Sequence, residues 1–134
     1  MGDTETEAVI ELRGKPIKLR RPGSYALRVD IMSAANSNAL RAKAAALGLC
    51  WATGGPGIQR PIRVDYGQHG YSPLLYGGAI LDELCGVRGI RPLELAPLLQ
   101  RAYDLCIAGL VTAEDLKEIE GFTEATEQRP DSDE

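Results

Sequence analysis

The hydrophobic period of the sequence changes at Pro22-Gly23, and this change restricts the chain to a fold that combines strands with helices. Over residues 17–20, apolar and basic residues alternate, and a period of two is typical of a half-buried β-strand. A second apolar run precedes it, and the Gly/Pro break at 14–16 between the two runs predicts a β-hairpin over 8–20. Because an isolated hairpin is only marginally stable in water, this one is expected to pack on the rest of the chain.

After Pro22-Gly23 the apolar residues recur every three or four positions, which is the spacing of amphipathic α-helices. Aromatic residues make up only 5% of the chain, so the core must be built from Leu, Ala, Ile and Val, which suits helices that approach closely. Ser24 is a candidate N-cap for the first helix, and Ser72-Pro73 is a typical helix start. The expected helices span about 24–35, 39–52, 73–85, 93–108 and 112–121.

The predicted fold class is therefore α+β, with a short N-terminal β-hairpin packed on a mostly helical body of about five helices. A chain of 134 residues has room for one such domain, which we expect over 8–121. The segment 53–71 is rich in glycine and proline and is expected to be a long loop within that domain. The flanking segments 1–7 and 122–134 are acidic and poor in apolar residues, so both are expected to be disordered.

Charge is sorted sharply along the chain. Residues 8–113 hold 13 Lys/Arg and 7 Asp/Glu, a net charge of +6, whereas 1–7 carries three acids and no base. The segment 114–134 carries nine acids and two bases, a net charge of −7, and the whole chain has a net charge of −4. A basic body between two acidic ends is typical of a protein that manages contacts with other proteins. The acidic C-terminal end could also lie across the basic body until a partner displaces it.

A cluster of basic residues near the N-terminus could contact phosphates, but the pattern does not favour nucleic-acid binding. The cluster lacks exposed aromatic residues for base stacking, the total charge is negative, and the acidic ends would compete with DNA. We therefore predict protein–protein contacts for these charges, and no nucleic acid. The cluster consists of Arg13, Lys15, Lys18, Arg20, Arg21 and Arg28.

No apolar run approaches the roughly 20 residues that span a membrane, and the N-terminus opens with acids where an export signal would have bases. We therefore predict a cytoplasmic protein that does not enter the membrane. Cys50, Cys85 and Cys106 agree with this compartment, because they are odd in number, far apart in sequence and flanked by apolar residues. They are expected to be free, mostly buried thiols and not metal ligands.

Candidate catalytic chemistry is sparse. His69 is the single histidine, in a glycine-rich segment with Asp65, but no nucleophile is marked near it. Asp82-Glu83 are adjacent on a predicted helix and point about 100° apart, so they cannot share a substrate proton. The glycine-rich segment 54–57 lacks the Lys-Ser/Thr of a phosphate loop, and its proline removes an amide donor. We therefore expect no enzyme activity and no cofactor.

The C-terminal half carries an ordered series of short phrases. YGGAILDEL at 76–84 precedes a glycine-bracketed turn, and PLEL at 92–95 opens the next helix. AGLVTAE at 108–114 and GFTEA at 121–125 then lead to the acidic end. This order resembles the tail assembly chaperones of long-tailed bacteriophages and related gene transfer particles, over roughly residues 8–125. In that family a small N-terminal β element precedes a helical body; the glycine- and proline-rich segment 53–71 departs from this pattern.

The resemblance implies a non-enzymatic role in the cytoplasm of a bacterial host. Such chaperones bind the tape measure protein and tail tube subunits and keep them soluble during tail morphogenesis. A chaperone for a long amphipathic helical protein needs an apolar groove between helices and a charged rim. The residues expected to contact a partner in this way are Ile80, Leu84, Leu95, Leu99, Ala102 and Cys106 in the groove, with the basic residues Lys18 and Arg20.

Two other functions fit the same sequence. A structural virion component, such as a head–tail connector or tail-completion subunit, would use the charge sorting in contacts between the subunits of a ring. A small cytoplasmic enzyme would be built around His69 and Asp65. A homo-oligomer is also compatible with the sequence.

Overall fold

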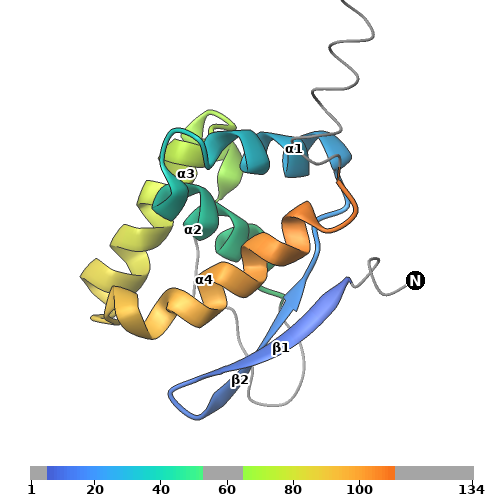
Figure 1. Cartoon of the computed structure of the whole chain (residues 1–134). Coiled ribbons are helices and arrows are strands. Elements are labelled where there is room, and N and C mark those ends of the chain that lie inside the picture. The colour runs from blue at the N-terminus through green and yellow to red at the C-terminus, as the bar shows by residue number, and fades with distance from the viewer. Residues whose placement is uncertain (1–5, 53–64, 111–134) are drawn as a thin grey trace, which may run out of the picture.

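The computed structural model describes residues 6–52 and 65–110, and its fold is α+β, as the sequence predicted. An N-terminal hairpin of two strands is followed by a mostly helical body (Figure 1). The expected helix at 112–121, the expected disordered end at 122–134 and residues 1–5 of the expected disordered segment 1–7 lie outside the described residues. The expected boundary at 7 is wrong, because Glu7 is paired with Arg20 in the hairpin. None of the helices in the described ranges is long and apolar enough to cross a membrane.

The hairpin consists of β1 (Glu7–Leu12) and β2 (Lys15–Arg20), which pair antiparallel. They are joined by Arg13-Gly14, whose φ angles of 54° and 81° are both positive, as a two-residue type I′ turn requires. The expected break at 14–16 was therefore placed one residue too late, because β2 already includes Pro16. Its side chains alternate as predicted, with Ile17 and Leu19 buried.

Polar side chains fix where the first three α-helices begin. Ser24 Oγ accepts a hydrogen bond from the Leu27 amide at 3.1 Å, and Ser72 Oγ accepts one from the Leu75 amide at 3.3 Å. Asn38 caps the second helix in the same way. Each cap satisfies an amide that the first helical turn leaves without a partner. The α-helices are α1 (Tyr25–Ala34), α2 (Ala39–Cys50), α3 (Pro73–Leu81) and α4 (Pro92–Ile107).

Two further helical segments depart from the sequence prediction. The α-helix expected to run to about residue 85 ends at Leu81 and continues as a π-helical segment, η3 (Asp82–Val87). Residues expected to be loop form a short 3₁₀ helix, η2 (Tyr66–His69). The rest of the expected loop, 53–64, lies outside the described residues.

Helix α2 lies at the centre of the body, in contact with α1, α3 and α4 (Figure 1). Its alanines 44, 45 and 46 are fully buried, which lets the neighbouring helices come close. The closest approach is at Gly77 of α3, where an added Cβ would lie 1.9 Å from the main-chain oxygen of Arg41. Only a residue without a side chain fits there, so the α2–α3 contact depends on Gly77.

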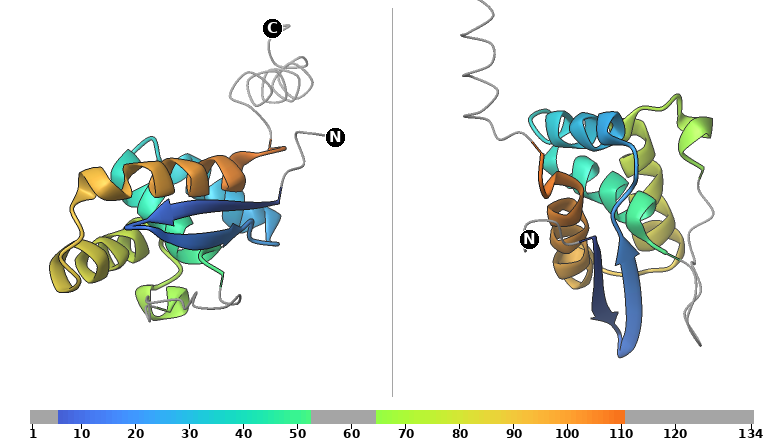
Figure 2. Two further views of the ribbon diagram at one scale, coloured as in Figure 1. Left: turned by 90° about the horizontal axis from the view of Figure 1, so that it is seen from below. Right: turned by 90° about the vertical axis from the view of Figure 1, so that its right-hand side faces the viewer.

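Helix α4 packs against both α2 and the hairpin, and β1 is the strand nearer to α4 in both views of Figure 2. The inward side chains of β1 are half-buried against the core. The C-terminal end of α4 is held by Arg28 of α1, whose Nε donates to the Cys106 carbonyl at 2.8 Å and whose Nη2 donates to the Ala108 carbonyl. Arg21 Nη1 also donates to Ala108, at 3.3 Å. These carbonyls lie at the negative end of α4, where helical carbonyls lack partners.

Candidate partner-binding surface

The six apolar residues that were expected to line a groove are brought together, but inside the protein. Their exposed fractions are 4% or less, so the prediction that these residues line an exposed groove is wrong. The apolar stripes of α3 and α4 are already covered by α2 and the hairpin, which leaves no apolar face for a partner at these positions. The residues concerned are Ile80, Leu84, Leu95, Leu99, Ala102 and Cys106.

Lys18 and Arg20, the two basic residues expected to contact a partner, do lie at the surface, on the outer face of β2. Both face Glu7 of β1: Arg20 Nε is 3.1 Å from a Glu7 carboxylate oxygen, and Lys18 Nζ is 3.7 Å from the other. Val9 lies beside them with 62% of its surface exposed. The outer face of the hairpin is thus a charged, solvent-exposed surface with one apolar residue in it.

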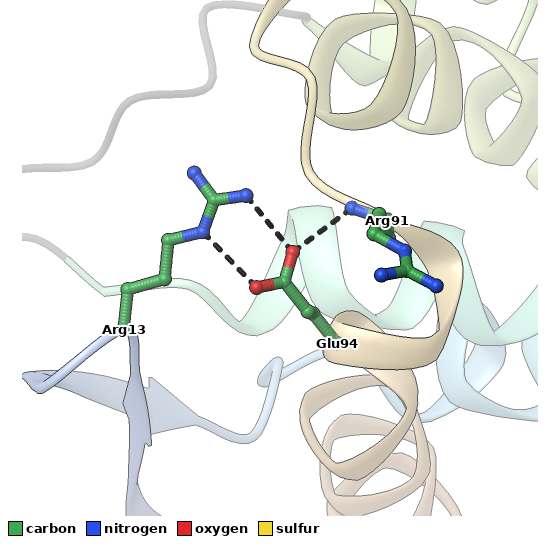
Figure 3. Close-up of polar contacts among 3 residues, drawn as sticks. All are labelled: Arg13, Arg91 and Glu94. Atoms are coloured by element: carbon green, nitrogen blue, oxygen red, sulfur yellow. Dashed lines mark hydrogen bonds and ion pairs between the residues drawn. The ribbon is translucent and has the colours of Figure 1, made fainter.

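The tip of the hairpin is tied to the start of α4 by Glu94 (Figure 3). Arg13 donates to both carboxylate oxygens, from Nη2 at 2.9 Å and from Nε at 3.3 Å, and the Arg91 amide donates to the first of them at 3.1 Å. The hydrogen bonds from Arg13 and from Arg91 lower the pKa of Glu94, and the carboxylate raises the pKa of Arg13. This contact joins the tip of the hairpin to the first turn of α4.

Other members of the basic cluster are used within the chain. Arg28 is only 7% exposed, and burial, reinforced by the charge of Arg21, lowers the pKa of its guanidinium. Its two donated hydrogen bonds go to main-chain carbonyls of the α4 end, so Arg28 is not available to phosphates. The inclusion of Arg28 in a phosphate-contacting cluster was therefore wrong. Its position three residues before the buried Ile31, on the same helix face, is the sequence signal that could have shown this.

The cysteines are free, as expected, and two of them meet. Cys50 and Cys106 are fully buried with their Sγ atoms 3.6 Å apart, although 56 residues separate them in sequence. Hydrogen bonding to Cys106, together with burial, raises the pKa of the Cys50 thiol. Cys85 is half-buried, less than expected for an inward position, and burial raises its pKa too. Thiols with raised pKa values are weak nucleophiles at neutral pH.

His69 is positioned by the main chain and not by a carboxylate. Its Nδ1 is 3.0 Å from the main-chain oxygen of Asp65, and its ring lies against the buried Tyr76. Tyr66 completes a small aromatic cluster, with its hydroxyl donating to the Tyr71 carbonyl at 2.7 Å. The cluster fastens η2 to α3, and the sequence analysis missed it because it depends on the turn at residue 70.

The remaining candidates also stay outside any assembled site. Glu83 binds Arg88 at 3.0 Å, a contact within η3 and its exit. Within residues 6–52 and 65–110, no group of three His, Cys, Asp or Glu side chains is arranged to hold a metal ion. The glycine-rich segment 54–57 lies outside the described residues.

In comparisons with known proteins, no family model, curated protein or solved structure matches this chain.

Proposed function

We propose that the chain is a non-enzymatic tail assembly chaperone of a long-tailed bacteriophage or a related gene transfer particle, acting in the cytoplasm of a bacterial host. Its clients are the tape measure protein and the tail tube protein. The resemblance of the segments at 76–84, 92–95 and 108–114 supports this proposal. So does the order of elements, because a hairpin before a helical body is the arrangement that the resemblance implies.

The observation that carries the proposal is the exposed outer face of the hairpin. The apolar stripes of α3 and α4 through Ile80 and Leu95 are packed within the chain, so we assign the clients to the charged outer face of the hairpin. On that face Lys18 and Arg20 lie around Glu7, with the exposed Val9 at their side. Charged groups on an exposed face guide association and select partners more than they add raw affinity. Such contacts are reversible, which suits a chaperone that releases its clients.

The test is co-expression with the tape measure protein and with the tail tube protein of the same particle, followed by co-purification through a tag on the client. We expect at least one client to retain this chain, and the double variant Lys18→Glu/Arg20→Glu to be retained about tenfold less. The matched control is Arg41→Glu/Arg88→Glu, which changes the net charge equally at exposed positions outside the hairpin and its contact with α4. The control should behave as the unchanged chain.

Retention of neither client would overturn the proposal. A native mass measurement on the same samples distinguishes the structural alternative, because a connector or tail-completion subunit would form a closed ring without any client. Equal losses in the hairpin variant and the control would show that total charge, and not this face, determines binding.

A further inference from the structure

The two edges of the hairpin are not equivalent. The Arg21 amide donates to the Thr6 carbonyl at 2.8 Å, which makes these two residues a hydrogen-bonded pair. From the register of the two strands, the hydrogen-bonded pairs then recur at every second residue, and the residues between them turn their main-chain groups outward. The outward groups of β1 belong to Glu7, Val9 and Glu11, which we call the β1 edge.

The outer edge of β2 is closed. Pro16 has an outward position and no N–H to offer a further strand. The Lys18 carbonyl accepts a hydrogen bond from the Ala52 amide at 2.9 Å, and Leu19 forms a β-bridge with Trp51. The segment after α2 therefore occupies this edge, which is one way in which proteins prevent unwanted strand pairing.

The β1 edge has no such cover within residues 6–52 and 65–110. No main-chain hydrogen bond beyond the hairpin is formed there by Glu7, Val9 or Glu11, and all three side chains are exposed. An edge with free donors and acceptors is a template for an added strand. The difference between the two edges indicates where an extended segment of another chain can join the sheet.

The charge of the β1 edge excludes a second copy of the same edge. Antiparallel pairing centred on Val9 would set Glu7 of one copy opposite Glu11 of the other, twice in the pair. Like charges directly opposite each other destabilise a strand pair. A shift of two residues toward the turn would set Arg13 opposite Glu7, but Arg13 lies in the turn at a positive φ and is paired with Glu94.

The same charges specify the partner. The Glu7 carboxylate forms ion pairs with Lys18 and Arg20, whereas Glu11 has no ion pair among the described residues. On an added strand, the side chains opposite these carboxylates would lie on the outer face and would be basic. The alternate side chains would face the same side as Ala8 and Ile10, which pack against the core, and would be apolar.

We propose that the β1 edge binds, by strand addition, an extended segment of a different protein in which basic and apolar residues alternate. This inference goes beyond the proposed function, since it rests on the hairpin alone and requires no particular client.

The probe is an acetylated peptide of alternating lysine and valine, with the same peptide carrying glutamate for lysine as its twin. Backbone amide exchange measured by NMR gives the readout. The amides of Glu7, Val9 and Glu11 should exchange rapidly in the free protein, and the lysine peptide should slow them by about tenfold or more. The glutamate twin should leave them unchanged. Protection of these amides in the free protein, or protection by neither peptide, would overturn the proposal.

Two variants make the test specific. Val9→Pro removes an outward N–H without touching the bonds to β2, and it should weaken binding of the lysine peptide about tenfold. Glu11→Lys should reverse the peptide preference, and it should also produce concentration-dependent dimers, because an opposite charge then stands across from Glu7 of the second copy. Asp30→Lys on α1 is the control for total charge and should do neither. Unchanged preference in Glu11→Lys would show that peptide binding lies elsewhere.

Discussion

The α2–α3 contact and the hairpin–α4 contact are built in opposite ways. At the first, glycine and alanine bring two helices together until main-chain atoms limit the approach, as at Gly77 against Arg41. At the second, a two-stranded sheet lies on α4 through one half-buried face and through a polar contact at its tip, between Arg13 and Glu94. The first contact has no room for added atoms, whereas the second has an exposed face and an open edge.

This difference implies that the α2–α3 contact mainly determines the stability of the fold, whereas the hairpin is free to interact with partners. A closely packed contact is sensitive to small changes in volume, because protein interiors are packed as densely as organic crystals. A hairpin with one solvated face tolerates substitutions on that face, so its charges can be selected for partners. Variants of the two regions should therefore affect different measurements, and the following predictions run from the largest expected effect to the smallest.

Gly77→Ala should be the most damaging single substitution at the α2–α3 contact. Its Cβ would lie 1.9 Å from the Arg41 main-chain oxygen, so the two helices would have to separate. We expect a loss of about 3 kcal/mol or more in the free energy of unfolding, measured by urea denaturation.

Gly78→Ala is the matched control on the same helix. Its Cβ would lie 3.3 Å from Cζ of Arg41, which is the movable end of a side chain, and alanine is favoured over glycine in a helix by up to about 1 kcal/mol. Stability should therefore stay equal or rise. Equal losses in the two variants would show that α2 and α3 are not in close main-chain contact.

Arg28→Met should cost about 2 kcal/mol, because it leaves the Cys106 carbonyl without its donor and weakens the capping of Ala108. Arg28→Lys keeps the charge near the end of α4 and should lose less. The loss should appear in the unfolding midpoint and as faster amide exchange in the last turn of α4. A stability that is unchanged in Arg28→Met would mean that water replaces the guanidinium at no cost.

The reaction rates of the three cysteine thiols allow a direct comparison of the packed body with its periphery. The half-buried Cys85 should react with a thiol reagent first, whereas Cys50 and Cys106 are fully buried against each other and should react only when the body opens. We expect one fast thiol and two that are about a hundredfold slower in native buffer, with all three fast in denaturant. Cys85→Ser should remove the fast phase; a fast phase that persists would place Cys50 or Cys106 at an accessible position.

Periodicity predicted which residues are buried, but not what buries them. The stripes through Leu95 and Leu99 of α4 were correctly placed on an apolar face, yet they were interpreted as a groove for a partner. Their neighbours in the fold come from α2 and the hairpin. The angles at which these elements cross cannot be predicted from the pattern of one sequence. The contact between Cys50 and Cys106 depends on the same angles.

Local signals were more reliable where a single turn decides the structure. The capping residues Ser24 and Ser72 were placed correctly, because an N-cap acts within three residues. The change to π-helix at Asp82–Val87 was missed, since the pattern of apolar residues there still fits an α-helix. Lys18 and Arg20 were correctly placed at the surface by strand alternation, although their ion pairs with Glu7 require the register of the hairpin.

The smallest expected effect is the pH dependence of the hairpin tip. Hydrogen bonds from Arg13 and Arg91 lower the pKa of Glu94 below 4.5, its ordinary value. A carboxyl group whose pKa is lower in the folded state stabilises that state at pH values above its unfolded pKa. This contribution is lost as the pH falls through the folded pKa. The bond between Arg13 and Glu94 should therefore be intact at pH 7 and break once the pH falls through the lowered pKa of Glu94 in the folded state.

The Arg13 Nε–H resonance reports this bond directly by NMR. It should shift in the unchanged chain as acid protonates Glu94, and stay constant in Glu94→Gln, which has no carboxyl group to titrate. Because both side chains are exposed, the unfolding midpoint should hardly differ between the two proteins at any pH. A large loss of stability in Glu94→Gln would mean that the hairpin depends on its tip as the α2–α3 contact depends on Gly77. The contrast between a packed body and a lightly held hairpin would then be wrong.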